Sequence, residues 1–399
     1  MESDLKAWQR SAIRNTMANY RRAQDNYYVA GKPLVELDGG YKAFSLLTPP
    51  LGSPAARRRV KLIMENMLES NRSAAAAPAP ASFPMKARTP HVVTMAVTYN
   101  CQCDCLHCSA VDYQEKTRRE KSALAFEELK GAIDQALDLG TTCIVLTGGE
   151  PLLYEKIYGL IAGVDKNRSV CTIFSNGEFL LEHTVRKLKQ AGIYGVFVSL
   201  DHHQAEAHDD HRKRPGLAKK AWRGLRLCQE AGILTGVSTY ATKENIRNGE
   251  LDAMMDLARA LGVLEVFLFD VIPTGRLAAQ HECMLSEEDA RQVADFRARY
   301  TAKPDYPRII HQTMFSSIAY PCVAEGCPAG MVQLHLRANG DVCPCDFTPH
   351  SFGNIRQQPL REIWDSMCAH PLYERASARC RLSQPDFWVK LGELGSAAD

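Results

Sequence analysis

The sequence predicts an α/β fold, a partial (β/α)6 barrel with an N-terminal mostly helical segment and a C-terminal extension. Between residues 90 and 280, short apolar runs alternate with helical stretches. This is the pattern of parallel strands joined by right-handed helical crossovers. Six such units fit an open barrel, in which chemistry is expected at the C-terminal strand ends. The predicted strands are 92–98, 143–149, 171–177, 195–201, 235–242 and 264–271.

The composition narrows the class of protein. The chain has 399 residues, enough for one large domain with appendages. Its net charge of +2 is too small to indicate nucleic acid or an anionic membrane as a partner. No apolar run reaches about 18 residues, so we expect no transmembrane helix, and the N-terminus is unlike a signal peptide. We expect a cytoplasmic protein whose 14 cysteines are metal ligands and core residues rather than disulfides.

Three parts are expected along the chain. Residues 1–82 form a helical and mixed segment that ends in the low-complexity linker 73–82, and this segment is a candidate substrate-recognition module. Its helix at 55–68 is rich in Arg and Lys, which we interpret as a solvated face. Residues 83–304 form the barrel. Residues 305–399, where the alternation stops and cysteines return, form the extension.

A cysteine-rich loop follows directly on the first predicted strand. Cys101, Cys105 and Cys108 are spaced Cys-x3-Cys-x2-Cys, and a loop this tight can aim three thiolates at one point. Three thiolates can hold three irons of a 4Fe–4S cluster and leave the fourth iron open to a small molecule. Zinc is the alternative, with Cys103 or His107 as a fourth ligand.

The second predicted strand runs into the turn Gly148-Gly149-Glu150-Pro151. Together with the cysteine loop, at this order and distance, the turn resembles the radical S-adenosylmethionine (radical SAM) superfamily. The resemblance implies the partial barrel of that family, a 4Fe–4S cluster on the three cysteines, and SAM chelating the open iron. It also implies that Gly148, Gly149, Glu150 and Pro151 line the methionine end of SAM. Gln102 is a minor departure, since Asn often follows the first cysteine in the family.

Polar residues at the ends of later strands are further candidates. In the enzymes that this sequence resembles, the third to fifth strand ends contact the ribose and carboxylate of SAM, and the sixth lies over the adenine. Hydroxyl and amide groups suit a dry pocket that must hydrogen-bond these parts, whereas turn capping is the structural alternative. Arg276 could pair with a carboxylate of SAM or substrate, or form a structural salt bridge. The candidates are Ser175, Asn176, Ser199, Thr239 and Arg276.

The extension carries a second set of cysteines. A hairpin with an Asn339-Gly340 turn leads to Cys343 and Cys345. The spacing of Cys327, Gly340 and Cys345 resembles the SPASM extension of radical SAM enzymes or its shorter twitch form, which implies an auxiliary 4Fe–4S cluster. We expect one such cluster, because the further cysteine run of a full SPASM extension is missing from the sequence. Zinc is again the alternative. The expected ligands are Cys322, Cys327, Cys345 and Cys380.

Several other residues remain open or are interpreted as structural. Cys343 competes with Cys345 as a ligand, because positions two apart on a strand point the same way. The histidine-rich stretch 201–214 is interpreted as solvated polar residues at a helix start, although one histidine could serve as an acid or base. The cysteines expected to be packed in the protein rather than to act as ligands are Cys143, Cys171, Cys228 and Cys368.

The expected function follows from the resemblance. It implies a radical SAM oxidoreductase or maturase that takes one electron from a donor such as flavodoxin or ferredoxin, cleaves SAM, and abstracts hydrogen from an unactivated C–H bond. Relatives with this extension suggest a ribosomally made peptide or protein as substrate, with the auxiliary cluster assisting electron transfer. The alternative is a small-molecule step of the haem-precursor or sugar type. A zinc-stabilised, non-enzymatic scaffold is the remote alternative.

Overall fold

The computed structural model describes most of the chain. The proposed ligand Cys322, most of the linker 73–82 and the segment before residue 32 lie outside the described residues. Among the described residues, no helix is long and apolar enough to span a membrane. The ranges that the structure describes are 32–74, 88–120, 122–314 and 326–396.

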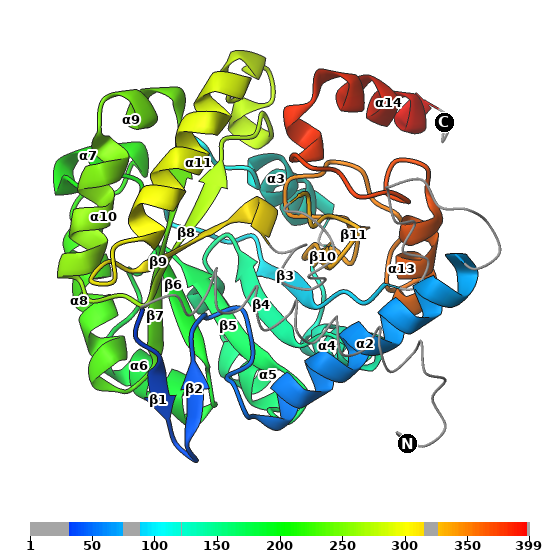
Figure 1. Cartoon of the computed structure of the whole chain (residues 1–399), viewed down its shortest axis with the longest axis horizontal. Helices are drawn as coiled ribbons and strands as arrows, with labels where there is room; N and C mark the ends of the chain where they lie inside the picture. The colour runs from blue at the N-terminus through cyan, green and yellow to red at the C-terminus, as the bar shows by residue number, and fades with distance from the viewer. Residues whose placement is uncertain (1–31, 75–87, 121, 315–325, 397–399) are drawn as a thin grey trace.

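A nine-stranded sheet organises the fold, in the order β11-β10-β3-β4-β5-β6-β7-β8-β9 (Figure 1). All neighbouring strands pair in parallel except β11, which is antiparallel to β10. The sheet has two edges and is therefore an open, partial barrel. Its strands are β3 (Val92–Thr98), β4 (Cys143–Gly148), β5 (Val170–Ser175), β6 (Gly195–Ser199), β7 (Leu234–Ala241), β8 (Glu265–Asp270), β9 (Arg308–His311), β10 (Gln333–Leu336) and β11 (Val342–Cys343).

Helices connect the strands and cover the outer face of the sheet (Figure 1). Helix α4 illustrates the cause: Leu129, Ile133 and Leu137 form one buried stripe, and Gly140, with φ +107°, ends the helix in the left-handed conformation. The helices of the barrel are α3 (Val111–Glu120), α4 (Phe126–Leu139), α5 (Ile157–Gly163), α6 (Glu182–Gln190), α7 (Ala205–His211), α8 (Leu217–Glu230), α9 (Lys243–Arg247), α10 (Glu250–Ala260) and α11 (Glu287–Thr301).

The six strands predicted from the sequence are all present, but the sheet continues beyond residue 304. Strand β9 adds to one edge through β8, and the hairpin of the extension adds to the other edge through β3. The hairpin is therefore part of the same sheet as the barrel. Strand β9 is not predicted from the sequence, because it contains only two apolar residues, Ile309 and Ile310. The remainder of the extension contains α13 (Leu360–Ala369) and α14 (Pro385–Ser396).

The described part of the N-terminal segment closes the barrel at the N-terminal ends of its strands. After the hairpin of β1 (Val35–Leu37) and β2 (Tyr41–Ala43), the chain inserts Leu46, which is fully buried. The Leu46 carbonyl accepts a hydrogen bond from Thr172 Oγ1 at 2.7 Å, and its amide donates to Glu265 Oε1 at 2.5 Å. A Cβ on Gly195 would lie only 2.7 Å from the Leu46 side chain. Residues 41–48 therefore act as a structural plug.

Helix α2 (Pro54–Ala74) follows the plug and differs from its interpretation as a solvated face. Arg59 is buried. Arg58 donates to the carbonyls of Leu137 and Thr141, at the end of α4. Carbonyls at a helix end have no partner within the helix and attract cations. Two of the arginines of α2 thus attach the helix to the barrel.

The plug makes a prediction about stability. Changing Leu46 to Ala should lower the free energy of unfolding by about 2–5 kcal/mol, because it removes a fully buried side chain and leaves a cavity. Denaturant unfolding monitored by circular dichroism measures the change. The exposed Lys42 on β2 provides the control, since Lys42→Ala should have little effect. Equal stability of the two variants would contradict a structural role for this segment.

Candidate active site

The cysteine loop leaves the C-terminal end of β3 and is held by backbone hydrogen bonds to two other loops. The amides of Asp104 and Leu106 donate to the carbonyls of Arg212 and His211, at 3.1 and 3.0 Å. The Cys108 carbonyl accepts from the amide of Arg276 at 3.0 Å. These contacts fix the loop over one cavity. The cavity is lined by the three motif cysteines and by Cys103, whose thiol lies within hydrogen-bonding reach of Cys101 and Cys105.

The glycine turn after β4 packs directly against the start of this loop. The amide of Gly149 donates to the carbonyl of Thr98, and the amide of Glu150 donates to that of Asn100, both at 2.8 Å. A Cβ on Gly148 would lie 2.0 Å from the Thr98 oxygen, and a Cβ on Gly149 2.4 Å from the Asn100 oxygen. Gly148 also has φ +138°, which L-residues rarely adopt. Only glycine fits at these two positions, and both glycines line the cavity.

Glu150 does not line the cavity. Its side chain connects the end of β4 to the end of β5. It is fully buried and accepts hydrogen bonds from Ser175 Oγ at 2.9 Å, the Asn176 amide at 2.8 Å and the Leu152 amide at 3.1 Å. Burial raises its pKa to about 7, although these hydrogen bonds oppose the shift. Pro151 begins the short helix η2 (Pro151–Leu153) and also lies outside the cavity lining. Both residues position the turn.

Asn176 presents an unused hydrogen-bond donor at the cavity. Its Oδ1 accepts from the Glu178 amide at 3.0 Å and from Gln102 Nε2 at 3.1 Å, so its Nδ2 atom is the donor. That atom is buried and has no partner in the described structure. Gln102 also donates to Glu178 Oε2 at 2.8 Å, which joins the cysteine loop to the end of β5. Ser175 and Asn176 both line the cavity.

On the next strands, the residues that line the cavity are Ser199, Ser238 and Tyr240. Ser238 Oγ donates to Ser199 Oγ at 3.2 Å. Thr239, the residue selected from the sequence, is not part of the lining. Successive side chains alternate between the two faces of a strand, so Thr239 points away. The register of β7 could not be read from its sequence, which has polar or small residues at several consecutive positions.

Arg276 also lies outside the cavity lining. Its guanidinium pairs with the carboxylate of Asp104 in the cysteine loop and donates to the Asp104 carbonyl at 3.1 Å. Of the two alternatives left open by the sequence, the structural salt bridge is the one observed. Gly275 explains the close approach, since a Cβ there would lie 2.2 Å from the Cys108 carbonyl oxygen.

The histidine-rich stretch supplies a buried ion pair. Arg212 donates two hydrogen bonds to Asp201, at 2.7 and 2.9 Å, and Arg212 lines the cavity. His107 lies 3.8 Å from Asp201 and its ring packs on Tyr240. Among the described residues, no three His, Cys, Asp or Glu side chains are grouped to hold a single metal ion. The interpretation of this stretch as solvated is wrong for Asp201 and Arg212. These residues lie before and after helix α7, and the helix brings their side chains together.

The second cysteine set reaches the same cavity. Cys327, Cys345 and Cys380 line it, and the thiols of Cys327 and Cys380 are hydrogen-bonded to each other. Cys343 is fully buried on β11 and does not line the cavity. The two cysteines differ because β11 ends at Cys343 and the chain bends at Pro344. The rule that residues two apart on a strand point the same way therefore does not apply to Cys343 and Cys345.

The four cysteines that were expected to be packed, Cys143, Cys171, Cys228 and Cys368, are buried or half-buried. Cys143, Cys171 and Cys228 are buried in the core, which confirms the prediction. Cys368 on α13 is half-buried against the core.

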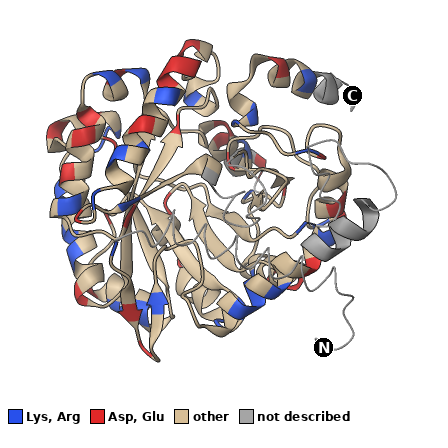
Figure 2. Ribbon diagram, in the orientation of Figure 1, with Lys and Arg blue, Asp and Glu red and all other residues tan. Residues whose placement is uncertain are grey.

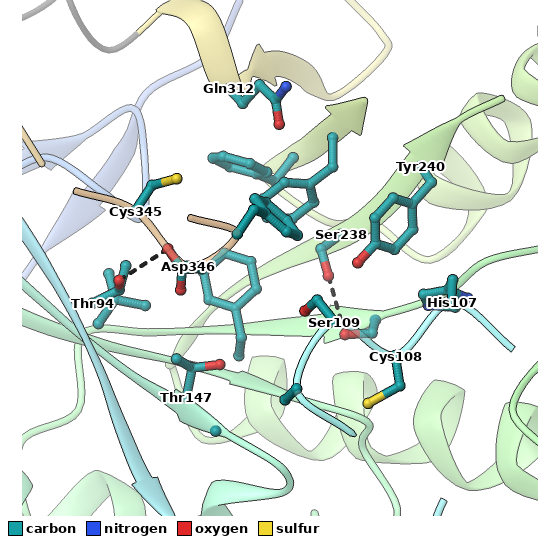
Figure 3. Close-up of a pocket in the computed structure, with 18 of the residues that line it drawn as sticks. Thr94, His107, Cys108, Ser109, Thr147, Ser238, Tyr240, Gln312, Cys345 and Asp346 are labelled. Carbon is teal, nitrogen blue, oxygen red and sulfur yellow. Dashed lines mark hydrogen bonds between the residues drawn. The ribbon is translucent and has the colours of Figure 1, made fainter. Parts of the chain in front are cut away.

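The cavity between the two cysteine sets has an aromatic wall and a polar side. Figure 3 shows Cys345 and Asp346 at one side and His107, Cys108 and Tyr240 at the other. Asp346 accepts hydrogen bonds from Thr94 and Gln333, both at 3.0 Å. Burial by itself would raise the pKa of Asp346, but His335 and the hydrogen bond from Thr94 outweigh burial, so the pKa is lowered. The aromatic residues of the wall are Phe174, Phe267, Phe269 and Phe347.

A second polar group stands at the ends of β8 and β9. His311 Nε2 lies 2.8 Å from Asp270 Oδ1, and His311 Nδ1 lies 2.7 Å from Thr313 Oγ1. Thr313 and its neighbour Gln312 line the cavity. The imidazole therefore orients a hydroxyl at the cavity wall.

The residues present fit iron–sulfur clusters and SAM. Soft thiolates suit iron, and each cysteine set presents three described sulfurs to the cavity. The buried Nδ2 of Asn176 needs an acceptor, which the oxygens of SAM would provide. The paired hydroxyls of Ser199 and Ser238 add further hydrogen-bonding groups. These observations agree with the cofactors inferred from the sequence.

The comparisons with known proteins agree with this site. Residues 95–258 match the family model of the radical SAM superfamily, and residues 327–382 match that of an iron–sulfur cluster-binding domain. The chain is 28% identical over 294 residues to the AdoMet-dependent heme synthase of Methanosarcina barkeri, covering 69% of this chain and 82% of that protein. It is 25% identical over 312 residues to the subtilosin biosynthesis protein AlbA of Bacillus subtilis, covering 74% of this chain and 63% of that protein.

Among solved structures, SuiB of Streptococcus suis bound to S-adenosylmethionine has a similar fold. Its TM-score is 0.57 at 17% identity, over 78% of this chain and 71% of that one. The match to the radical SAM model selects an iron–sulfur cluster over zinc at the cysteine loop. The chain belongs to the radical SAM superfamily and is an enzyme that uses SAM and iron–sulfur clusters, with a C-terminal cluster-binding extension.

Proposed function

We propose that this enzyme modifies a ribosomally made peptide or protein at an unactivated C–H bond. The observation that carries the proposal is the composition of the shared cavity. Its wall is aromatic, and its polar side centres on the carboxylate of Asp346. The only Arg or Lys in the described lining is Arg212, and Asp201 already neutralises it. Such a site suits an apolar or aromatic side chain beside backbone N–H donors better than a ligand with several carboxylates.

A haem precursor is the second candidate, favoured by the similarity to AdoMet-dependent heme synthases. A porphyrin ring would fit an aromatic wall, but its carboxylates would need cationic partners. Similarity to peptide-modifying proteins such as AlbA and PqqA peptide cyclase supports the first candidate. The composition of the cavity decides our preference between the two.

Each part of the site has an assigned role in the proposal. Cys101, Cys105 and Cys108 would hold three irons of the first cluster. Asn176 and the hydroxyls of Ser199 and Ser238 would hydrogen-bond SAM. When bound, the cluster and SAM supply a 5′-deoxyadenosyl radical that removes a hydrogen atom from the substrate.

The protein itself positions the target bond and excludes competing donors. In the proposal, the aromatic wall would pack against the substrate, and Asp346 and Thr313 would orient it through hydrogen bonds. Cys327, Cys345 and Cys380, with Cys322 as the fourth ligand, would hold one auxiliary cluster. A cluster with four cysteine ligands suits electron transfer or structural support rather than substrate binding.

Mass spectrometry of anaerobic reactions tests the substrate class. The reconstituted enzyme would be incubated with SAM, dithionite and either a precursor peptide encoded beside its gene or a carboxylate-bearing haem precursor. We expect a mass change in the peptide together with formation of 5′-deoxyadenosine. Conversion of the haem precursor, with the peptide unchanged, would contradict the first candidate and support the second.

The cysteine loop generates the first prediction about activity. Changing Cys101, Cys105 or Cys108 to Ala should abolish formation of 5′-deoxyadenosine from SAM and dithionite, because each removes an iron ligand. Liquid chromatography of quenched reactions measures the product. Cys103→Ala is the matched control, since Cys103 lies in the same loop but outside the motif, and it should retain cleavage. Equal loss in the control would assign a ligand role to Cys103.

The auxiliary ligands generate a second prediction. Changing Cys345 to Ala should reduce the iron content of the anaerobically reconstituted protein by about four atoms per chain, the content of one cluster. Cys343→Ala should keep the full iron content, because its thiol does not face the cavity. Iron and sulfide analysis distinguishes the two variants. Iron loss from Cys343→Ala alone would reverse the assignment.

A third prediction concerns the binding of SAM. Ser238→Ala should raise the SAM concentration needed for half-maximal cleavage roughly 2- to 10-fold, the effect of one lost hydrogen bond. Thr239→Val, one residue along β7, should leave it unchanged. Rates of 5′-deoxyadenosine formation at varied SAM provide the measurement. The reverse order of effects would show that the sequence-based choice of Thr239 was the correct one.

A further inference from the structure

Gln102, which follows the first motif cysteine, reaches across to the loop after β5. Its Nε2 atom donates to Asn176 Oδ1 at 3.1 Å and to Glu178 Oε2 at 2.8 Å. Gln102 is half-buried. Neither Gln102 nor Glu178 lines the cavity, whereas Asn176 does. Any effect of Gln102 on a molecule in the cavity must therefore pass through a neighbouring residue, and Asn176 is the one that it contacts.

The Glu178 carboxylate fixes which end of the Gln102 amide faces this loop. A carboxylate only accepts hydrogen bonds, so the donor atom Nε2 of Gln102 turns toward it. The oxygen of Asn176 then lies between two donors, Gln102 Nε2 and the Glu178 amide. Because the oxygen is held, the Nδ2 atom of Asn176 is directed the other way, where it is buried and has no partner in the described structure.

Glu178 is itself held from the side of α8. Arg214 donates to both carboxylate oxygens, at 2.9 Å each, and Lys220 Nζ donates at 2.6 Å. The hydrogen bonds from Arg214 are the largest cause that lowers the pKa of Glu178 to about 2. The carboxylate therefore stays ionised, and remains an acceptor, at neutral pH. Figure 2 shows the basic residues along α8.

Close packing holds the loop after β5 against α8. Gly177, between Asn176 and Glu178, has φ +85°, and a Cβ there would lie 2.9 Å from the Cα atom of Ala221. Glycine is the residue that allows such an approach. The approach brings the loop beside Lys220, the residue before Ala221, and so explains how one carboxylate can bind α8 on one side and the cysteine loop on the other.

We propose that Gln102 is a positioning residue for SAM, which aims the Nδ2 donor of Asn176 at an oxygen of the bound cofactor. The proposal rests on the contact between Asn176 and SAM proposed above. A donor there can bind the carboxylate or a ribose oxygen of SAM, whereas a reversed amide would present its own oxygen to them. Gln102 is one methylene longer than the Asn that is frequent at this position in the family, which extends its reach toward Glu178.

Equilibrium dialysis of labelled SAM against the full-length, reconstituted enzyme tests the proposal without turnover, because no reductant is present. Gln102→Ala and Gln102→Glu should each raise the dissociation constant for SAM roughly 5- to 30-fold, the effect of a buried hydrogen bond that is lost or reversed. Gln102→Glu keeps the length of the side chain and replaces the donor with an acceptor. Iron content should stay at the level of the unmodified enzyme in both variants. With dithionite, the KM for SAM should rise and kcat should not change.

A double-mutant cycle separates positioning from an independent role. Asn176→Ala should weaken SAM binding by itself. Adding Gln102→Ala should not weaken it further, because the group that Gln102 positions is already gone. Gln190, an exposed residue on α6, provides the control, and Gln190→Ala should bind SAM as the unmodified enzyme does.

The outcomes distinguish the inference from the contact on which it rests. Normal SAM binding in both Gln102 variants, with weaker binding in Asn176→Ala, would overturn the positioning role alone. So would full additivity in the double variant, or loss of iron from the Gln102 variants, since a residue that only holds the cysteine loop would give either result. Normal binding in Asn176→Ala would refute the contact between Asn176 and SAM and the inference with it.

Discussion

The site depends on the contact between two backbones, where the glycine turn after β4 meets the start of the cysteine loop after β3. Two hydrogen bonds join them, from Gly149 to Thr98 and from Glu150 to Asn100. No side chain fits between them, since a Cβ on either glycine would collide with a carbonyl oxygen. The cysteine loop therefore begins from a position that is fixed relative to β4.

Other contacts extend this fixed start into a complete cavity. Glu150 holds the end of β5 in place through Ser175 and the Asn176 amide, and the backbone of Arg212 holds the far part of the cysteine loop. On the other side, β10 pairs with β3 and brings the hairpin of Cys345 into the same sheet. Strand β3 thus leads into the cysteine loop and pairs with the strand whose hairpin delivers Cys345, and residues of both cysteine sets line a common cavity.

The sequence predicted much of this arrangement, for reasons that are local. The six strands were recognisable because buried parallel strands are continuous apolar runs, and the cysteine and glycine motifs are short segments. The interpretation of the basic face of α2 as solvated is wrong for Arg58 and Arg59, which pack against the barrel, and right for Arg57 and Lys61, which are exposed. The structural salt bridge of Arg276 remained one of two alternatives, because its partner Asp104 is distant in sequence.

The sequence by itself determined which chemical groups are present and the order in which the strands deliver them. It determined the three-cysteine loop, the glycine turn and the alternation of strands and helices, because each depends on residues close together in the chain. Only the tertiary structure decided that Ser238 rather than Thr239, and Cys345 rather than Cys343, face the cavity. Those choices depend on strand register and on the point where β11 ends, which are set by pairing with distant segments rather than by local sequence.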